Sequence, residues 1–170
     1  MWCVSAMWCV SASKQTHTTC AHTGDIKALV LAMRGMPHES VVQQWGCGAL
    51  ANLARMKEHI PDAIAAAGGI EAIVNAIQST AERGVQEQGL FALSNLLTDN
   101  LNRRVQKAVW DANVIPIVAA RLKAHPGETI VQERGCMVLG YLLRYSPQDG
   151  MKALVSQLCS SIVKVVPINR

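Results

Sequence analysis

One pattern occurs three times in the chain, as VQQWGCGALANLA (Val42–Ala54), VQEQGLFALSNLL (Val85–Leu97) and VQERGCMVLGYLL (Val131–Leu143). The three copies align without gaps and start 43 and 46 residues apart. Apolar or small residues recur in each copy at i, i+4, i+7, i+8 and i+11, the spacing of one face of an α-helix. In the middle copy these residues are Val85, Gly89, Ala92, Leu93 and Leu96. A fixed period of this length predicts a repeat protein.

A second, shorter pattern precedes each copy and has nearly the same period. It occupies residues 23–30, 67–74 and 112–119, with offsets of 44 and 45. The second residue of each copy is Gly24, Gly68 or Asn113, and these residue types most readily adopt the left-handed conformation that ends a helix. We therefore expect a short helix to turn sharply into a longer one there, as 61–67 into 69–79 and 103–112 into 114–124. Linkers are expected at 36–40, 80–84 and 125–129.

Glycine stands at one equivalent site of the three long copies, at Gly46, Gly89 and Gly135. Glycine inside a helix costs about 1 kcal/mol relative to alanine. A glycine at the same place in all three copies therefore indicates that two helix backbones approach closely there.

The succession HIPDAIAAAGGIEAIVNAIQS and VQEQGLFALSNLL, residues 59–79 and 85–97, resembles the armadillo repeat across one whole unit. The resemblance implies an all-α fold, a right-handed superhelical solenoid of three-helix repeats. The expected units are a partial one over 23–55, complete ones over 56–98 and 99–145, and a truncated one over 146–170. Helices are expected within 151–159 and 160–166 of this last unit. Residues 1–22, with the tandem MWCVSA, are expected to form a flexible leader.

The resemblance also implies that the third helix of each unit lines a concave groove that holds an extended peptide. In family members that carry import cargo, this helix has an aromatic residue followed four positions later by asparagine, and Phe91 with Asn95 resembles that pair. The other copies depart from it, with Gly48 before Asn52 and Met137 before Tyr141. The predicted partner-binding residues are Asn52, Arg55, Gln88, Phe91, Asn95, Arg134, Tyr141 and Arg144. Trp45 lies on the same stripe, either as an exposed anchor or as packing at the N-terminal end of the stack.

Charge on this stripe favours an acidic or neutral partner. Arg55, Arg134 and Arg144 belong to it, and no carboxylate does. An import adaptor for Lys-rich cargo would need acidic groups nearby. The sequence therefore predicts a non-catalytic scaffold for protein–protein interaction. Cargo import is one alternative, and a structural block that self-assembles through uncapped ends, giving a homo-oligomer, is another.

Composition excludes several other classes. The 170 residues are 50% hydrophobic and only 16% charged, so the chain can bury enough surface to fold. A net charge of +4 without interleaved aromatic residues gives no expectation of nucleic-acid binding, and no apolar run is long enough to suggest a membrane span. No catalytic constellation or cofactor motif is found, and His38, His59 and His125 stand singly. We expect no enzyme activity and no cofactor.

The six cysteines have no metal-site spacing, and Cys3, Cys9 and Cys20 with His17 and His22 match no zinc pattern. No metal is therefore expected. Cys47 and Cys136 fall within apolar helical patterns, so both are expected to be buried thiols. Thiols of this kind suit a reducing compartment, the cytoplasm first and the nucleus as an alternative.

Overall fold

The computed structural model describes residues 23–56, 59–98 and 102–145, and this part of the chain is all-α, without a strand. The expected terminal segments, 1–22 and 146–170, lie outside the described residues. The helices are α2 (Thr23–Gly35), α3 (Ser40–Ala54), α4 (Ile60–Ala66), α5 (Gly69–Ser79), α6 (Arg83–Leu97), α7 (Arg103–Asp111), α8 (Val114–Ala124) and α9 (Thr129–Tyr145). Within the described residues, the helices expected from the sequence are therefore present, with ends that agree to within one or two positions.

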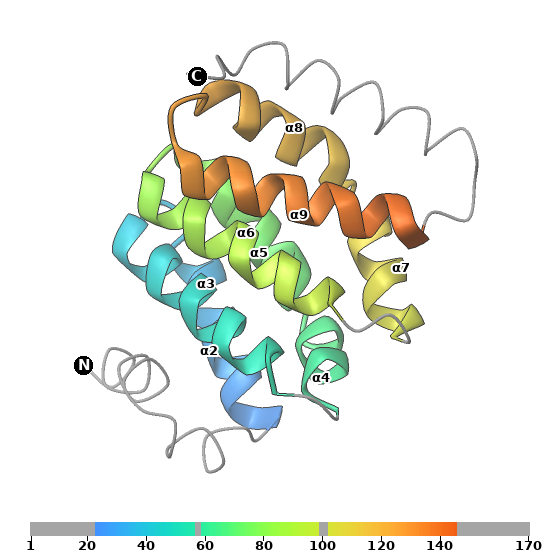
Figure 1. Cartoon of the computed structure of the whole chain (residues 1–170). Helices are drawn as coiled ribbons and strands as arrows, with labels where there is room; N and C mark the ends of the chain where they lie inside the picture. The colour runs from blue at the N-terminus through green and yellow to red at the C-terminus, as the bar shows by residue number, and fades with distance from the viewer. Residues whose placement is uncertain (1–22, 57–58, 99–101, 146–170) are drawn as a thin grey trace.

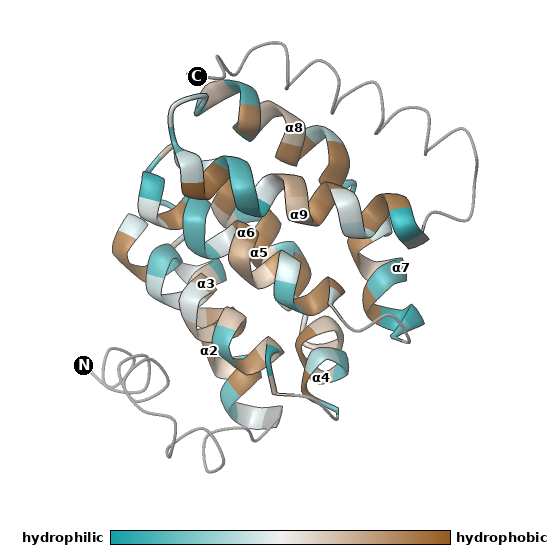
Figure 2. Ribbon diagram, viewed as in Figure 1, coloured by the Kyte–Doolittle hydropathy of each residue, from teal (hydrophilic) through white to brown (hydrophobic). Residues whose placement is uncertain are grey.

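The long helices form two layers. α3, α6 and α9 lie side by side at the front of Figure 1, and α3 with α6 and α6 with α9 are the two most extensive helix contacts. α5 packs behind α6 and α8 packs against α9, while the short helices α4 and α7 lie at one end. Figure 2 shows hydrophilic turns next to hydrophobic ones along α6 and α9, as the periodic pattern requires. The core fills the space between the layers, with fully buried residues such as Ile73, Leu93 and Leu139.

Two of the three predicted left-handed turns are confirmed. Gly68 has φ 75° between α4 and α5, and Asn113 has φ 51° between α7 and α8. The prediction is wrong at Gly24, which lies inside α2 with an ordinary helical neighbourhood. The residues that precede Thr23 lie outside the described ranges.

The repeated glycines are sites of close packing, but the atoms that approach them belong to side chains. A Cβ on Gly46, Gly89 or Gly135 would lie 2.6, 2.6 or 2.5 Å from the side chain of Met33, Ile77 or Leu122 respectively. Each of these side chains comes from the second helix of the same unit, and each occupies an equivalent position. The missing Cβ therefore lets the second helix of a unit seat a bulky residue against the third.

A repeated glutamine joins the same two helices, and the sequence analysis missed it. The side-chain Nε2 atoms of Gln43, Gln86 and Gln132 each donate two hydrogen bonds to main-chain carbonyls at the end of the second helix. For Gln86 the acceptors are Ile77 and Thr80, at 2.8 and 2.5 Å. Carbonyls at a helix end have no partner within the helix. The glutamine side chain supplies a hydrogen-bond donor to these carbonyls and so fixes the position of the start of the third helix against the end of the second.

Taken singly, the described helices lack the length or the hydropathy of a membrane span. α4 and α5 meet both criteria only as a pair, and they are bent by 68° at the Gly68 turn.

Candidate functional site

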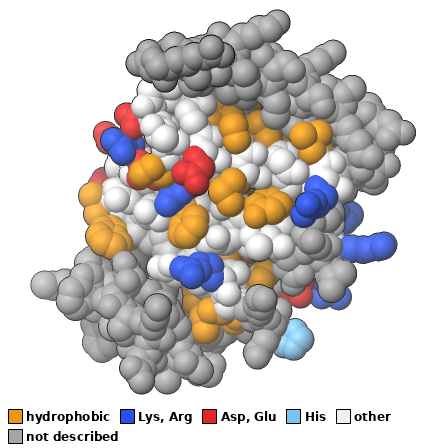
Figure 3. All heavy atoms as spheres, viewed as in Figure 1, with side chains coloured by type: hydrophobic (Ala, Val, Ile, Leu, Met, Phe, Trp, Pro, Cys, Tyr) orange, Lys and Arg blue, Asp and Glu red, His pale blue; other side chains and the backbone are white. Residues whose placement is uncertain are grey.

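The predicted partner-binding residues are carried by α3, α6 and α9, whose outer side is the face turned to the viewer in Figures 1 and 3. Figure 3 shows apolar side chains across this face, with basic and acidic side chains at separate places among them and along its edges. Of the predicted residues, Arg55 and Arg144 are exposed. The half-buried ones are Asn52, Gln88, Phe91, Asn95, Arg134 and Tyr141.

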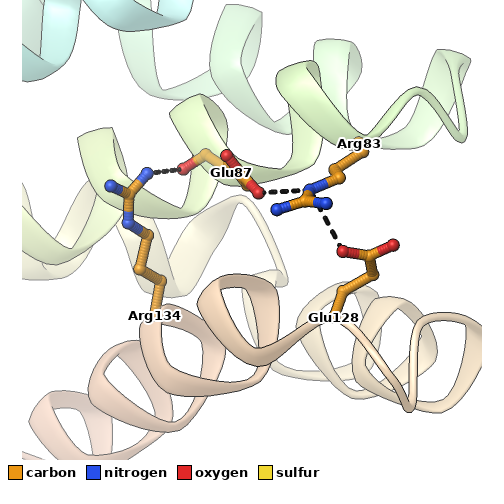
Figure 4. Close-up of polar contacts among 4 residues, drawn as sticks. All are labelled: Arg83, Glu87, Glu128 and Arg134. Atoms are coloured by element: carbon orange, nitrogen blue, oxygen red, sulfur yellow. Dashed lines mark hydrogen bonds and ion pairs between the residues drawn. The ribbon is translucent and has the colours of Figure 1, made fainter.

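Arg134 and Phe91 meet at the junction of α9 with α6. The guanidinium carbon lies 4.3 Å from the centroid of the Phe91 ring, a cation–π contact. The same guanidinium donates from Nη1 to the main-chain carbonyl of Glu87, over 2.6 Å (Figure 4). An arginine has five N–H donors. The arrangement therefore fixes the orientation of the cation without using up its hydrogen-bonding capacity.

Two carboxylates lie next to this junction, although none belongs to the predicted stripe. Arg83 Nε lies 2.6 Å from Glu87 Oε1 and 3.0 Å from Glu128 Oε2, so it connects α6 with the loop that precedes α9 (Figure 4). The hydrogen bond to Glu87, with the charges of both carboxylates, raises the pKa of Arg83. Because Arg83 is exposed, the trio adds little stability. Arg83 offsets one of the two negative charges, so the trio keeps one net negative charge.

Asn95 uses part of its amide inside the protein. Its Nδ2 donates to the main-chain carbonyl of Ala51 on α3, over 2.9 Å. Within the described ranges this is the one hydrogen bond found for the Asn95 amide, which leaves one donor and one acceptor for a ligand. Its Tyr141 equivalent on α9 has no amide, so this link between third helices is not repeated there.

The side chain of Gln88 lies against Gly48. A Cβ on Gly48 would lie 3.5 Å from Gln88 Oε1, so the side chain of Gln88 covers the place where an aromatic residue would stand on α3. The aromatic wall of the predicted groove is thus formed by Phe91 on α6, and by Tyr141 on α9, which also packs against the core. The structure brings Phe91 and Arg134 together, while Arg55 and Arg144 lie apart at the C-terminal ends of α3 and α9.

Trp45 is 41% exposed, so the alternative in which it serves as packing at the end of the stack is wrong for the described part of the chain. Trp45 holds on α3 the position that Gln88 holds on α6 and that Arg134 holds on α9. Met137, on the outer side of α9, is 43% exposed.

Only one of the two cysteines predicted to be buried is buried. Cys47 is fully enclosed between α3 and α6, where burial raises the pKa of its thiol to about 12. Cys136 is exposed, which corrects the prediction. The reason is its position: α6 covers Cys47, α9 covers the equivalent Leu90, and no described helix covers the corresponding side of α9.

The structure also has a surface cavity that sequence reasoning did not identify. It measures about 520 Å³ and lies between the second helices α5 and α8, away from the predicted face. Glu71, Asn75, Gln78 and Arg121 contribute polar atoms to its lining. This cavity depends on how two units pack side by side, which no single repeat encodes.

Within the described ranges, no three His, Cys, Asp or Glu side chains come together as a metal site would require. His125 Nε2 is a buried nitrogen without a hydrogen-bond partner, at the loop before α9.

Comparison with models of known protein families gives no match. Comparison with curated proteins gives none either. Among the solved structures that are similar to this chain, two are each described as an engineered protein. The first has a TM-score of 0.72 at 23% sequence identity, covering 92% of this chain and 61% of the other. The second has a TM-score of 0.66 at 21% identity, covering 92% and 69%. This chain thus spans less than two thirds of the first structure, and the likeness concerns the fold alone.

Proposed function

We propose that the chain is an armadillo-type repeat scaffold, without catalytic activity, that binds an extended protein segment across α3, α6 and α9. The recurrence of the same helix order, glycine contact and glutamine contact in successive units supports the armadillo assignment. In this proposal the units form a right-handed superhelical solenoid, and the protein acts in the cytoplasm or the nucleus.

The observation that carries the binding proposal is the stacking of Arg134 on Phe91. The ring and the guanidinium form one platform, held by the bond to the Glu87 carbonyl. Asn95 stands one helical turn beyond Phe91 on the same side of α6, with one amide donor and one acceptor available. Aromatic and arginine side chains of this kind dominate the energetics of protein interfaces.

Charge makes an acidic or neutral segment the preferred ligand. The face carries Arg55, Arg134 and Arg144, while Arg83 shares its one positive charge between Glu87 and Glu128 and leaves a single net negative charge there, so positive charge still prevails on the face. A carboxylate on the ligand would meet a cation with unused donors. A Lys-rich segment would find no unpaired carboxylate on this stripe.

The geometry sets the spacing of ligand residues. Packed helices lie about 8–10 Å apart, and an extended peptide advances about 3.3 Å per residue. Neighbouring third helices would therefore contact ligand residues two or three positions apart.

The test uses three pools of fluorescein-labelled 12-residue peptides that share one apolar frame and carry Glu, Gln or Lys at the variable positions. We expect affinity, measured by fluorescence anisotropy, to fall in that order. Phe91→Ala with Asn95→Ala should abolish capture while the helical circular dichroism signal is kept. Equal binding of the Lys pool, or unchanged capture by the double variant, would overturn the proposal.

Charge reversal at exposed positions provides a matched comparison. Arg144→Glu and Arg55→Glu should each weaken binding of the Glu pool about 5-fold, which corresponds to about 1 kcal/mol for an exposed pair. Arg103→Glu makes an equal charge change at an exposed position on α7, and it should leave the affinity for the Glu pool unchanged. Equal losses in all three variants would mean that only net charge attracts the peptide.

A further inference from the structure

The described stack has two uncovered edges, on α3 and on α9. On α3, Val42 is only half-buried, whereas the equivalent Val85 and Val131 are fully buried. On α9, Cys136 and Gly140 are exposed. Their equivalents on α3 and α6, listed next, are all buried: Cys47, Leu90, Ala51 and Ser94.

The two edges correspond to the two surfaces that meet where one third helix packs on the next, a contact that occurs twice in the described chain, between α3 and α6 and between α6 and α9. In both cases a third helix places one residue over the preceding third helix: Gln88 over Gly48, and Arg134 over Phe91. The residue equivalent to Gln88 and Arg134 on α3 is Trp45. The residue equivalent to Gly48 and Phe91 on α9 is Met137.

We propose that two copies of this chain associate head to tail, with α3 of one copy packed on α9 of the other in the register that joins α6 to α3. In this register Trp45 covers Met137, and a tryptophan ring against a thioether is a favourable contact. Asn52 takes the place of Asn95 and donates to the carbonyl of Gly140, as Asn95 donates to that of Ala51.

The register also accounts for Cys136 and for the glycine opposite it. Cys47 Sγ lies 3.8 Å from the Cβ that Gly89 lacks. In the proposed contact Gly46 of one copy faces Cys136 of the other, and the exposed thiol becomes buried. Both edges carry a large apolar side chain more than 40% exposed, and each would be covered by the other. A second copy is therefore the occupant that fits both edges with one contact.

The contact is heterologous, so a copy bound at one edge still presents the other, and association continues with concentration. Sedimentation velocity of the full 170-residue chain, without any peptide, should show masses above the 18.4 kDa monomer that increase across about 5–500 µM. Trp45→Glu and Met137→Glu should each remain monomeric, with unchanged circular dichroism because both side chains are exposed.

Mixing the two variants separates this geometry from a symmetric one. The Trp45→Glu chain retains an intact α9 edge and the Met137→Glu chain an intact α3 edge, so an equimolar mixture should form a 1:1 dimer and nothing larger. Leu31→Glu is the control. Leu31 is 65% exposed on α2, and the equivalent residues Asn75 and Ala120 remain exposed although their helices have neighbouring units, so the proposed contact should not cover Leu31. That variant should associate like the parent chain.

Alkylation of Cys136 by iodoacetamide, followed by peptide mass spectrometry, gives an independent measure. The rate should fall at least 5-fold between dilute and concentrated protein, and should not fall in Met137→Glu. A monomer at every concentration, as would result if residues 1–22 or 146–170 covered the edges, overturns the proposal. Self-association of Met137→Glu alone also overturns it. Since no peptide is present, failure here leaves the proposed peptide-binding function untouched.

Discussion

The buried glutamine Gln86 should be one of the most sensitive positions for stability. It is 0% exposed, and its Nε2 satisfies two carbonyls at the end of α5. Replacing it by alanine removes two hydrogen bonds worth about 1 kcal/mol each and leaves a small cavity worth about 1 kcal/mol. The Oε1 atom of Gln86 has no partner, so its removal returns part of this loss. We expect Gln86→Ala to lower the free energy of unfolding by about 2–3 kcal/mol.

Urea unfolding followed by circular dichroism at 222 nm measures the effect. Gln86→Met keeps the volume without the donor, and it should still cost about 2 kcal/mol. Gln132→Ala removes the same pair of contacts at a half-buried site where water can reach the carbonyls, and it should cost about 1 kcal/mol. Gln78→Ala, on the exposed side of α5, should stay within about 0.5 kcal/mol of the parent.

Two results would refute the reasoning. If Gln86→Met restored the stability of the parent chain, packing rather than hydrogen bonding would explain the site. If Gln86→Ala behaved like Gln78→Ala, the contacts to the α5 carbonyls would contribute nothing to the stability of the stack.

Three further changes should have measurable effects. Gly89→Ala should lower the free energy of unfolding in urea by about 1–3 kcal/mol, because the added Cβ would lie 2.6 Å from a buried side chain of α5. Gly140→Ala should raise it by up to about 1 kcal/mol, because Gly140 lies within α9 and its added Cβ would meet no neighbouring atom within 4 Å. Asn95→Ala should cost about 1 kcal/mol in the same measurement, since it removes the bond to Ala51 between α6 and α3. Burial raises the pKa of the Cys47 thiol from 9.0 to about 12. Between these pH values the unfolded chain loses a proton that the folded chain keeps. The free energy of unfolding of the parent chain should therefore fall by about 1.4 kcal/mol more per pH unit than that of Cys47→Ala. Equal pH slopes for Cys47→Ala and the parent would show that the thiol is not enclosed.

The helices and their ends could be predicted from the sequence because they depend on local patterns. The 3.6-residue periodicity placed α6 and α9, and the residues that tolerate a positive φ, Gly68 and Asn113, placed the sharp turns. The same reasoning failed at Gly24, which lies in the first turn of α2 without a positive φ.

The contacts between helices could be predicted only in part. The glutamine at the second position of each aligned copy is visible in the sequence, but its acceptors belong to another helix, so its role became apparent only in the fold. The stacking of Arg134 on Phe91 depends in the same way on the register of α9 against α6. Cys136 was predicted to be buried because its helical pattern is apolar, and it is exposed because burial also depends on the next helix in the stack.

The central claim is that an acidic or neutral extended segment binds across α3, α6 and α9. The most direct test is a two-dimensional ¹⁵N–¹H NMR titration of the full chain with the Glu-bearing 12-residue peptide pool. The largest shifts are expected on Phe91, Asn95, Arg134 and their neighbours, with little change along α5 and α8. Shifts concentrated at the α5–α8 cavity, or a stronger response to the Lys-bearing pool, would contradict it.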